Sequence, residues 1–203
     1  MDIPWAEIAS TSAAALSAVA AVGAWKAATR SNSTAERVEA IERDRWHADL
    51  LPQFDIRIER IEGDRATLDV QLTGPLPLCS LDNVEISIAS SDDQERVNRL
   101  PQSRPTQDDI DTQVWGPWRF THGADGADVG GNTVAPMSLQ VGRGRPFAIE
   151  RTRPPFWMEG PELDETWRER WREKPLRLHL RCTRGDDKPW SIPYAVDEAR
   201  LPQ

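Results

Sequence analysis

The sequence has few cysteines and lacks the short motifs that mark common enzyme and metal centres. Its 203 residues include two cysteines, neither of them in a C-x-x-C pair. No G-x-S-x-G elbow, H-E-x-x-H pair or phosphate-binding glycine loop is present. These absences argue against the familiar hydrolases, zinc sites and nucleotide-binding folds. We therefore expect a protein that is not an enzyme and holds no cofactor.

Net positive charge is also missing. The formal net charge is −8, which argues against broad nucleic-acid binding because phosphate contacts need a basic surface. One local basic run exists, made of Arg143, Arg145, Arg151 and Arg153. We interpret it as a solvated strand face and loop; contact with anionic lipid is the alternative.

An uncharged stretch, residues 8–25, is just long enough to cross a membrane. It holds 18 residues between Glu7 and Lys26. In a helix these span about 27 Å, against a hydrocarbon core of about 30 Å. Eight of the 18 are alanine, so only a few side chains favour insertion strongly. The candidate membrane-contacting residues are Ile8, Leu16, Val19, Val22 and Trp25.

The flanking charges indicate an orientation for this stretch. No lysine or arginine precedes it, whereas five follow within 20 residues, from Lys26 to Arg45. The positive-inside rule then predicts an uncleaved signal-anchor, single-pass in the cell membrane, with the C-terminal domain in the cytoplasm. A cleaved signal is a further alternative, although Asp2 and Glu7 replace the basic residues that it needs.

The same stretch permits a different interpretation, a soluble helix buried against a partner or a second copy. Three small residues, Ala13, Ser17 and Ala21, form a ridge that allows close helix contact and a homo-oligomer. The cysteines bear on orientation as well. In a cytoplasmic domain Cys79 and Cys182 stay reduced, whereas an inverted topology makes them a candidate disulfide.

Three regions follow from these patterns. Ser33 and Glu36 have the spacing of a capping box, which predicts a second helix that Pro52 ends. Its apolar stripe is too short for a coiled coil. The expected regions are residues 1–30 as the anchor or docking helix, 31–52 as a helical spacer, and 53–203 as a β-rich domain.

The third region alternates apolar and polar residues in short segments with turn residues between them. Expected strands cover residues 54–61, 66–72, 84–88, 114–120, 133–141, 146–150, 176–180 and 190–196. Seven or eight such strands without βα alternation predict a mainly β fold, an antiparallel β-sandwich of immunoglobulin-like kind. One late helix begins at Pro161, and residues 90–111 are expected to form a long loop.

Tryptophan is abundant, with nine residues. Buried, these rings would form a core, which is the favoured interpretation; exposed, they would form a groove for a partner peptide or a sugar. The run Pro-Pro-Phe-Trp at 154–157 is the part expected to be partly exposed. The candidate partner-binding residues are Trp115, Trp118, Phe156, Trp157, Trp167 and Trp171.

A glycine- and aspartate-rich segment, residues 122–132, is the nearest approach to a metal site. His122, Asp125 and Asp128 offer ligands that suit Ca²⁺. The EF-hand spacing is absent, however, and no acidic residue closes the loop. The favoured interpretation is a flexible turn, so we expect no metal and keep these three residues as weak candidates.

Three strings of residues carry a resemblance. They are Glu42 to Leu50 with Pro52 and Phe54 following, Val114 to Phe120, and Thr152 to Trp157. On these strings the chain resembles a group of uncharacterised actinobacterial proteins over residues 42 to about 196. The resemblance implies a short N-terminal anchor, a helical spacer and a β-rich domain. It implies no activity, ligand or catalytic residue, and the spacer is shorter here than in the group.

Together these observations predict a membrane-anchored cytoplasmic module that binds an unknown protein partner or acts as a scaffold. The tryptophan-rich faces and the 90–111 loop are the expected contact surfaces. One alternative is a soluble subunit of a larger assembly whose N-terminal helix docks on a partner. The other is a metal- or ligand-binding module that uses the 122–132 loop.

Overall fold

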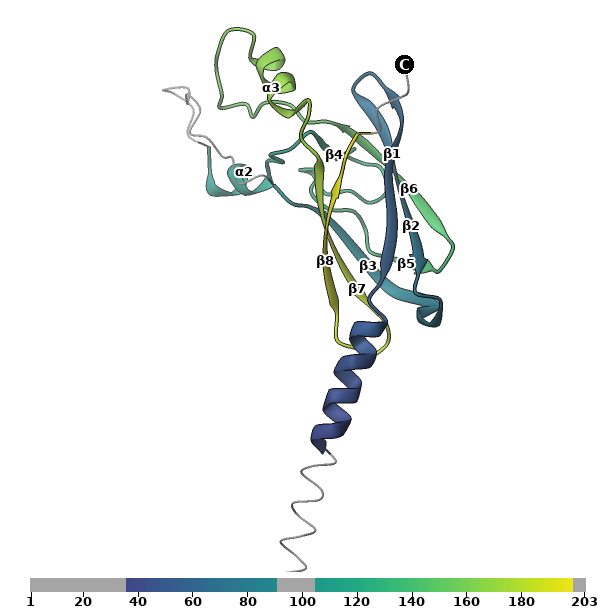
Figure 1. Ribbon diagram of the computed structural model, residues 1–203. Coiled ribbons are helices and arrows are strands. Elements are labelled where there is room, and N and C mark those ends of the chain that lie inside the picture. Colours follow the sequence, from purple (N-terminus) through teal and green to yellow (C-terminus); the bar gives the residue numbers. More distant parts are fainter. Residues whose placement is uncertain (1–35, 91–104, 199–203) are drawn as a thin grey trace, which may run out of the picture. The chain divides into compact units, whose positions relative to one another are not determined.

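The computed structural model describes residues 36–90 and 105–198 (Figure 1). The expected membrane stretch, its small-residue ridge and Ser33 lie outside these ranges. Within the ranges, no helix combines the length and the apolar character that a membrane span requires. The chain divides into two units, Met1–Asp49 and Leu50–Gln203.

The described part of the first unit is a helix over residues 36–49. It lies within the expected spacer and ends shortly before Pro52, since proline disfavours a helical residue before it. Glu39 and Arg43 form an ion pair at 2.5 Å across one turn, which contributes about 0.3–0.5 kcal/mol at an exposed site. The apolar residues Val38 and Ile41 are 52% and 65% exposed.

The second unit contains two four-stranded antiparallel sheets, so the mainly β prediction is confirmed. The first sheet has the order β1 (Gln53–Glu62), β2 (Arg65–Gly74), β6 (Gly144–Arg151), β4 (Trp118–Phe120). The second has the order β5 (Met137–Gln140), β3 (Ser80–Ile88), β7 (Leu176–Thr183), β8 (Trp190–Val196). The remaining elements are the 3-10 turn η1 (Leu76–Leu78) and the helices α2 (Gln107–Thr112) and α3 (Leu163–Trp171).

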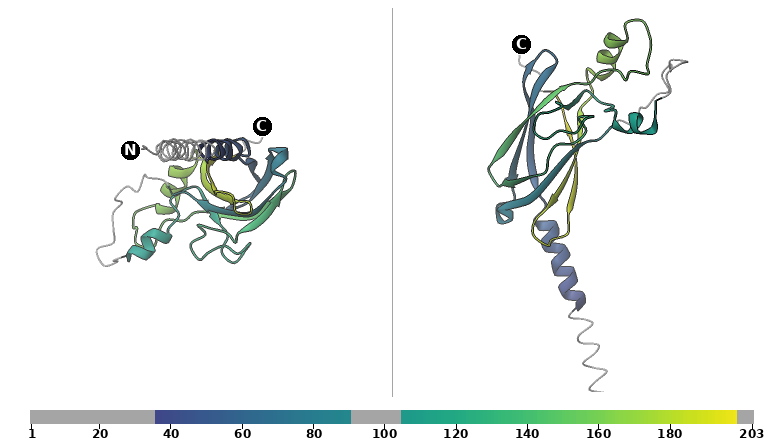
Figure 2. Two further views of the ribbon diagram at one scale, coloured as in Figure 1. Left: turned by 90° about the horizontal axis from the view of Figure 1, so that it is seen from below. Right: turned by 180° about the vertical axis from the view of Figure 1, so that it is seen from behind.

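Period-two alternation decides which face of each sheet is buried. Every second side chain of β2 and of β7 is buried, because successive residues of a strand point to opposite faces. Apolar residues from both sheets form one continuous cluster, and Figure 2 shows the two sheets curving around it. His179 alternates with Leu178 and Leu180 and lies on the outer face, as the pattern predicts.

The outer strands β1 and β8 approach each other at one edge of the unit. The backbone N–H of Phe54 donates to the hydroxyl of Tyr194 at 3.1 Å, and the two rings meet edge to face at 6.1 Å. Further along, Ile58 of β1 forms a parallel bridge with Glu198. These contacts cover strand edges that would otherwise expose unpaired backbone groups.

The helices correct two expectations. Of the predicted loop 90–111, residues 91–104 lie outside the described ranges, and most of α2 falls in the remainder. This helix starts with a capping box. The hydroxyl of Thr106 accepts from the Asp109 N–H at 3.1 Å, and the Asp109 carboxylate accepts from the Thr106 N–H at 2.8 Å. Hydrogen bonds from the Thr106 side chain, and then its backbone, lower the pKa of Asp109. The late helix begins at Leu163 instead of Pro161, because Glu162 before it is left-handed with φ 53°.

Two expected strands are shorter than predicted. The segment 114–120 pairs only as β4, and Pro117, which has no N–H to donate, directly precedes the paired residues. The segment 133–141 pairs as β5 over Met137–Gln140, with Thr133 making an isolated bridge to Ser87. Residues 114–117 take irregular backbone, and Trp115 among them packs against Trp167 of α3.

Candidate functional site

A second hydrophobic cluster, separate from the core between the sheets, packs beneath α3. We call it the tryptophan cluster; its buried members are Trp115, Trp157, Met158, Trp167 and Trp171. Trp167 and Trp171 are four residues apart and therefore share one face of α3. Their ring centroids are 5.7 Å apart, and Trp115 lies 5.6 Å from Trp167. This face of α3 therefore packs against the rest of the second unit.

Thr152 connects this cluster to the first sheet through hydrogen bonds. Its side chain is buried, with 5% of the residue exposed. The indole N–H of Trp167 donates to Thr152 Oγ1 at 3.0 Å, and the Thr152 hydroxyl donates to the backbone oxygen of Gly116. One hydroxyl thus joins α3, the residue after β6 and the segment before β4.

Two other indole groups of the cluster are unpaired. Trp115 Nε1 and Trp171 Nε1 are buried, and neither finds a hydrogen-bond partner within the described part of the chain. A buried unpaired donor of this kind costs about 1–3 kcal/mol. The two rings contribute to the cluster through apolar packing, and the Arg170 guanidinium lies over the Trp171 ring at 5.3 Å.

The candidate partner-binding residues separate into buried and exposed members. Trp118 is 1% exposed and belongs to the core between the sheets. Trp115, Trp157, Trp167 and Trp171 are buried in the tryptophan cluster. Phe156 is 67% exposed, and its ring stands edge-on to Trp157 with centroids 5.0 Å apart. Among these six residues, Phe156 is the one that is exposed.

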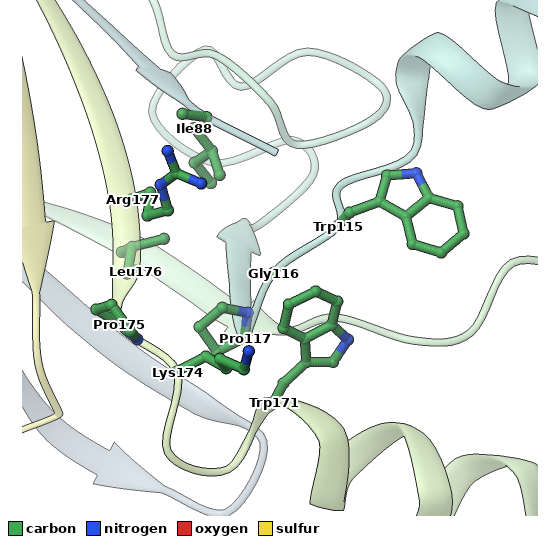
Figure 3. A pocket seen from close by; sticks show the side chains of 10 residues that line it. Ile88, Trp115, Gly116, Pro117, Trp171, Lys174, Pro175, Leu176 and Arg177 are labelled. Carbon is green, nitrogen blue, oxygen red and sulfur yellow. The ribbon is translucent and has the colours of Figure 1, made fainter. Parts of the chain in front are cut away.

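A pocket of about 270 Å³ opens beside the tryptophan cluster (Figure 3). It is formed where β3 ends, where the 115–117 segment passes, and where α3 leads into β7. We call it the β3–β7 pocket. Its larger apolar walls are Ile88, Trp115, Pro117, Trp171, Pro175 and Leu176. Lys174 and Arg177 complete the lining with two positive charges, and none of its described lining residues is acidic.

Neighbouring hollows near the end of β6 are lined by several arginines, and two of these form ion pairs with acidic residues from other segments. Arg168 lies 3.3 Å from Asp64. Arg151 lies 2.5 Å from Glu198, and its guanidinium stacks over Trp118 at 4.0 Å.

The basic run does not form one patch. Arg143 and Arg145 lie at the start of β6, whereas Arg151 and Arg153 lie at its end. An eight-residue strand separates them by roughly 20 Å at about 3.3 Å per residue. Arg145 also lies 3.8 Å from Asp125. The structure therefore divides a run that the sequence presents as continuous.

The aspartates of the 122–132 loop serve as hydrogen-bond acceptors within the fold. Asp125 Oδ2 accepts from the Ala148 N–H at 3.0 Å. Asp128 Oδ1 accepts from the Asn132 N–H at 2.8 Å, and its Oδ2 accepts from the Thr133 hydroxyl at 2.9 Å. Over residues 36–90 and 105–198, no group of histidine, cysteine and acidic side chains is arranged to hold a metal ion. His122 is exposed.

The two cysteines are free in the structure. Cys79 is exposed at the entrance to β3, whereas Cys182 is buried in the core. Burial, with a smaller contribution from Glu85, raises the pKa of Cys182 to about 12. A thiol with such a pKa stays protonated and unreactive at neutral pH.

One serine–histidine pair lies on the outer face of the second sheet. His179 Nε2 and Ser191 Oγ are 2.6 Å apart on adjacent strands. Neither residue belongs to the lining of the pockets described above. The pair forms a cross-strand hydrogen bond.

No local pattern in the sequence indicates the β3–β7 pocket. Ile88 and Arg177 are far apart in the chain, and they meet because β3 pairs with β7, where Ile88 is opposite Leu178. Lys174 and Arg177 look like ordinary surface charges after a helix.

Comparison with known proteins finds no matching family, no similar curated protein and no similar solved structure.

Proposed function

We propose that this protein is a non-catalytic interaction or scaffold module, held at the cytoplasmic face of the cell membrane by residues 8–25. Its β domain is proposed to be a sandwich of immunoglobulin-like kind. Support for the sandwich comes from two four-stranded antiparallel sheets around one core. The observation that carries the interaction role is the exposed aromatic ring of Phe156.

The backbone on either side of Phe156 is held in place by its neighbours. Its neighbour Trp157 is 6% exposed and belongs to the tryptophan cluster. Two prolines precede Phe156 in the sequence. The Met158 N–H donates to the Pro155 oxygen at 3.0 Å, which closes a backbone turn that contains Phe156. An aromatic side chain on a restricted backbone loses little conformational entropy on binding, and such residues are typical binding hot spots.

The tether rests on the one-sided charges around residues 8–25. Confining a domain to a membrane raises its effective concentration toward partners on the same surface. Weak contacts through one exposed ring then become sufficient for a useful complex. Fractionation of native cells tests the tether: we expect the chain in the membrane fraction, released by detergent. Recovery in the soluble fraction without detergent would contradict it and favour the soluble-subunit alternative.

Site-specific photo-cross-linking tests the interaction surface. A photoreactive phenylalanine at position 156, introduced in the native host, is expected to give a discrete adduct of defined mass. Val129 provides the matched control, since it is apolar and 83% exposed but lies on the 122–132 loop. Identical adducts from both positions, or none from position 156, would count against Phe156 as the contact residue.

A further inference from the structure

The β3–β7 pocket has walls that are held in place independently of any ligand. Trp115 and Trp171 belong to the buried tryptophan cluster, and Leu176 belongs to the core between the sheets. Pro117 and Pro175 restrict the backbone of the two loops that frame it. The pocket is thus preformed, as small-molecule sites usually are.

The charge of the pocket is opposite to that of the whole chain. The chain carries a formal −8, yet Lys174 and Arg177 face the cavity and none of the described residues in its lining is acidic. Figure 3 shows the side chains of Arg177 and Lys174 among the residues that line the pocket. Within residues 36–90 and 105–198, Arg177 makes no ion pair. Its planar guanidinium group can therefore donate two parallel hydrogen bonds to a carboxylate.

The volume limits the size of what the pocket can hold. At about 270 Å³ it falls just below the range of about 300–1,000 Å³ that drug-sized ligands occupy. A cavity of about 150 Å³ holds benzene in a well-studied engineered protein. One ring or a branched alkyl group together with a short acidic tail therefore fills this space.

The walls determine how such a ligand is bound. In Figure 3 the ring nitrogens of Trp115 and Trp171 lie on the sides away from β7. The tryptophans therefore offer carbon surface to the pocket, and its polar side-chain contacts come from the two cationic groups. A singly charged, planar anion on an apolar body matches this lining better than a multiply charged phosphate does, because only two cations are present.

We propose that the β3–β7 pocket binds a carboxylate carried by a single aromatic or branched apolar group. The apolar group lies against Trp115, Trp171 and Leu176, and the carboxylate meets the Arg177 guanidinium. Two sources share this chemistry: a free aryl-alkyl acid, and the C-terminal residue of a peptide, whose carboxylate lies beside its side chain.

The test measures binding to the full chain by ligand-observed NMR titration. The probes are 3-phenylpropionate, for a free acid, and N-acetyl-phenylalanine, for a peptide C-terminus. The corresponding amides serve as uncharged controls. Both acids, or one of them, are expected to bind about tenfold or more tightly than their amides, since a charge-assisted hydrogen bond contributes about 1.5–3 kcal/mol.

Two arginine variants locate the site. Arg177→Gln is expected to weaken acid binding about tenfold or more while leaving amide binding unchanged. Arg181→Gln is the matched control, because Arg181 lies on the same strand and face but pairs with Glu85 at 3.7 Å outside the pocket. Its affinity for the acids is expected to equal that of the unaltered chain. Circular dichroism of both exposed-site variants verifies that each remains folded.

The outcomes divide clearly. Tighter binding of 3-phenylpropionate supports a free acid as the ligand, and tighter binding of N-acetyl-phenylalanine supports a peptide C-terminus; either result supports the proposal. Absence of acid binding at millimolar concentration would overturn it. So would equal affinity for acids and amides, or equal losses in the two arginine variants.

Discussion

Replacement of Thr152 by valine tests how the tryptophan cluster is held to the sheet. Valine keeps the shape of threonine but removes the hydroxyl, which bonds both Trp167 Nε1 and the Gly116 oxygen. Both partners would remain buried without a hydrogen bond. Each buried polar group left without a hydrogen bond costs about 1–3 kcal/mol, so the expected loss of unfolding free energy for the two groups is roughly 2–6 kcal/mol. That is a large part of the total of about 5–15 kcal/mol for a typical domain.

Thr152→Ser is the matched control. Serine keeps the hydroxyl and loses one methyl group, which costs about 1 kcal/mol. The order of the two variants is therefore diagnostic. If packing alone held Thr152, valine would be the milder change because it buries more apolar surface; if the hydroxyl bridge matters, serine is the milder change.

Urea unfolding of the full chain, followed by tryptophan fluorescence and circular dichroism, measures both variants. A third and fourth variant, Trp167→Phe alone and with Thr152→Val, complete a double-mutant cycle. Phenylalanine at 167 removes one of the two orphaned groups, so a coupling energy of about 1 kcal/mol or more is expected. A Thr152→Val protein as stable as Thr152→Ser, or a coupling near zero, would refute the bridge.

Three further predictions concern other parts of the fold. Gly131→Ala should lower the urea midpoint far more than Gly123→Ala, because both glycines have positive φ but only a Cβ at 131 would overlap a backbone oxygen of β4. Ellman's reagent at pH 8 should modify Cys79 in the native chain and reach Cys182 only after unfolding, since burial raises the pKa of Cys182 to about 12. The unfolded state ionises this thiol first, so urea titrations should show stability falling as pH rises above about 9, by up to about 1.4 kcal/mol per pH unit. Asp128→Ala should destabilise the fold by about 1–3 kcal/mol, whereas calorimetry of the unaltered chain with Ca²⁺ should show no heat of binding.

The strands were predictable because burial of one face fixes their period. Leu68, Val70 and Leu72 alternate with polar residues, and each of them is fully buried. The structure of the segments that interrupt this alternation was harder to predict. The short helix α2 has a capping box, Thr106 with Asp109, that could have been recognised, but its six residues carry no apolar periodicity. The order of strands within each sheet depends on long-range pairing, which local patterns do not encode.

The aromatic residues show the same limit. Trp118 and Phe156 both occur beside prolines, so their local sequence does not distinguish them. Trp118 is buried because β4 pairs with β6 and places it opposite Arg151, whose guanidinium then stacks on its ring. Phe156 follows the end of β6, where no strand fixes its side chain against the core. The burial of each of these two rings is therefore decided by long-range contacts and not by its local sequence.

The construction of the β3–β7 pocket has an evolutionary consequence. Several of its lining residues lie outside the strands: Ala89 follows β3, Gly116 and Pro117 precede β4, and Lys174 follows α3. Exchanges at exposed positions such as Lys174 alter the ligand that is accepted without changing strand register or the core. Descendants of this chain can therefore acquire new specificities by single substitutions, while each intermediate remains folded and open to selection.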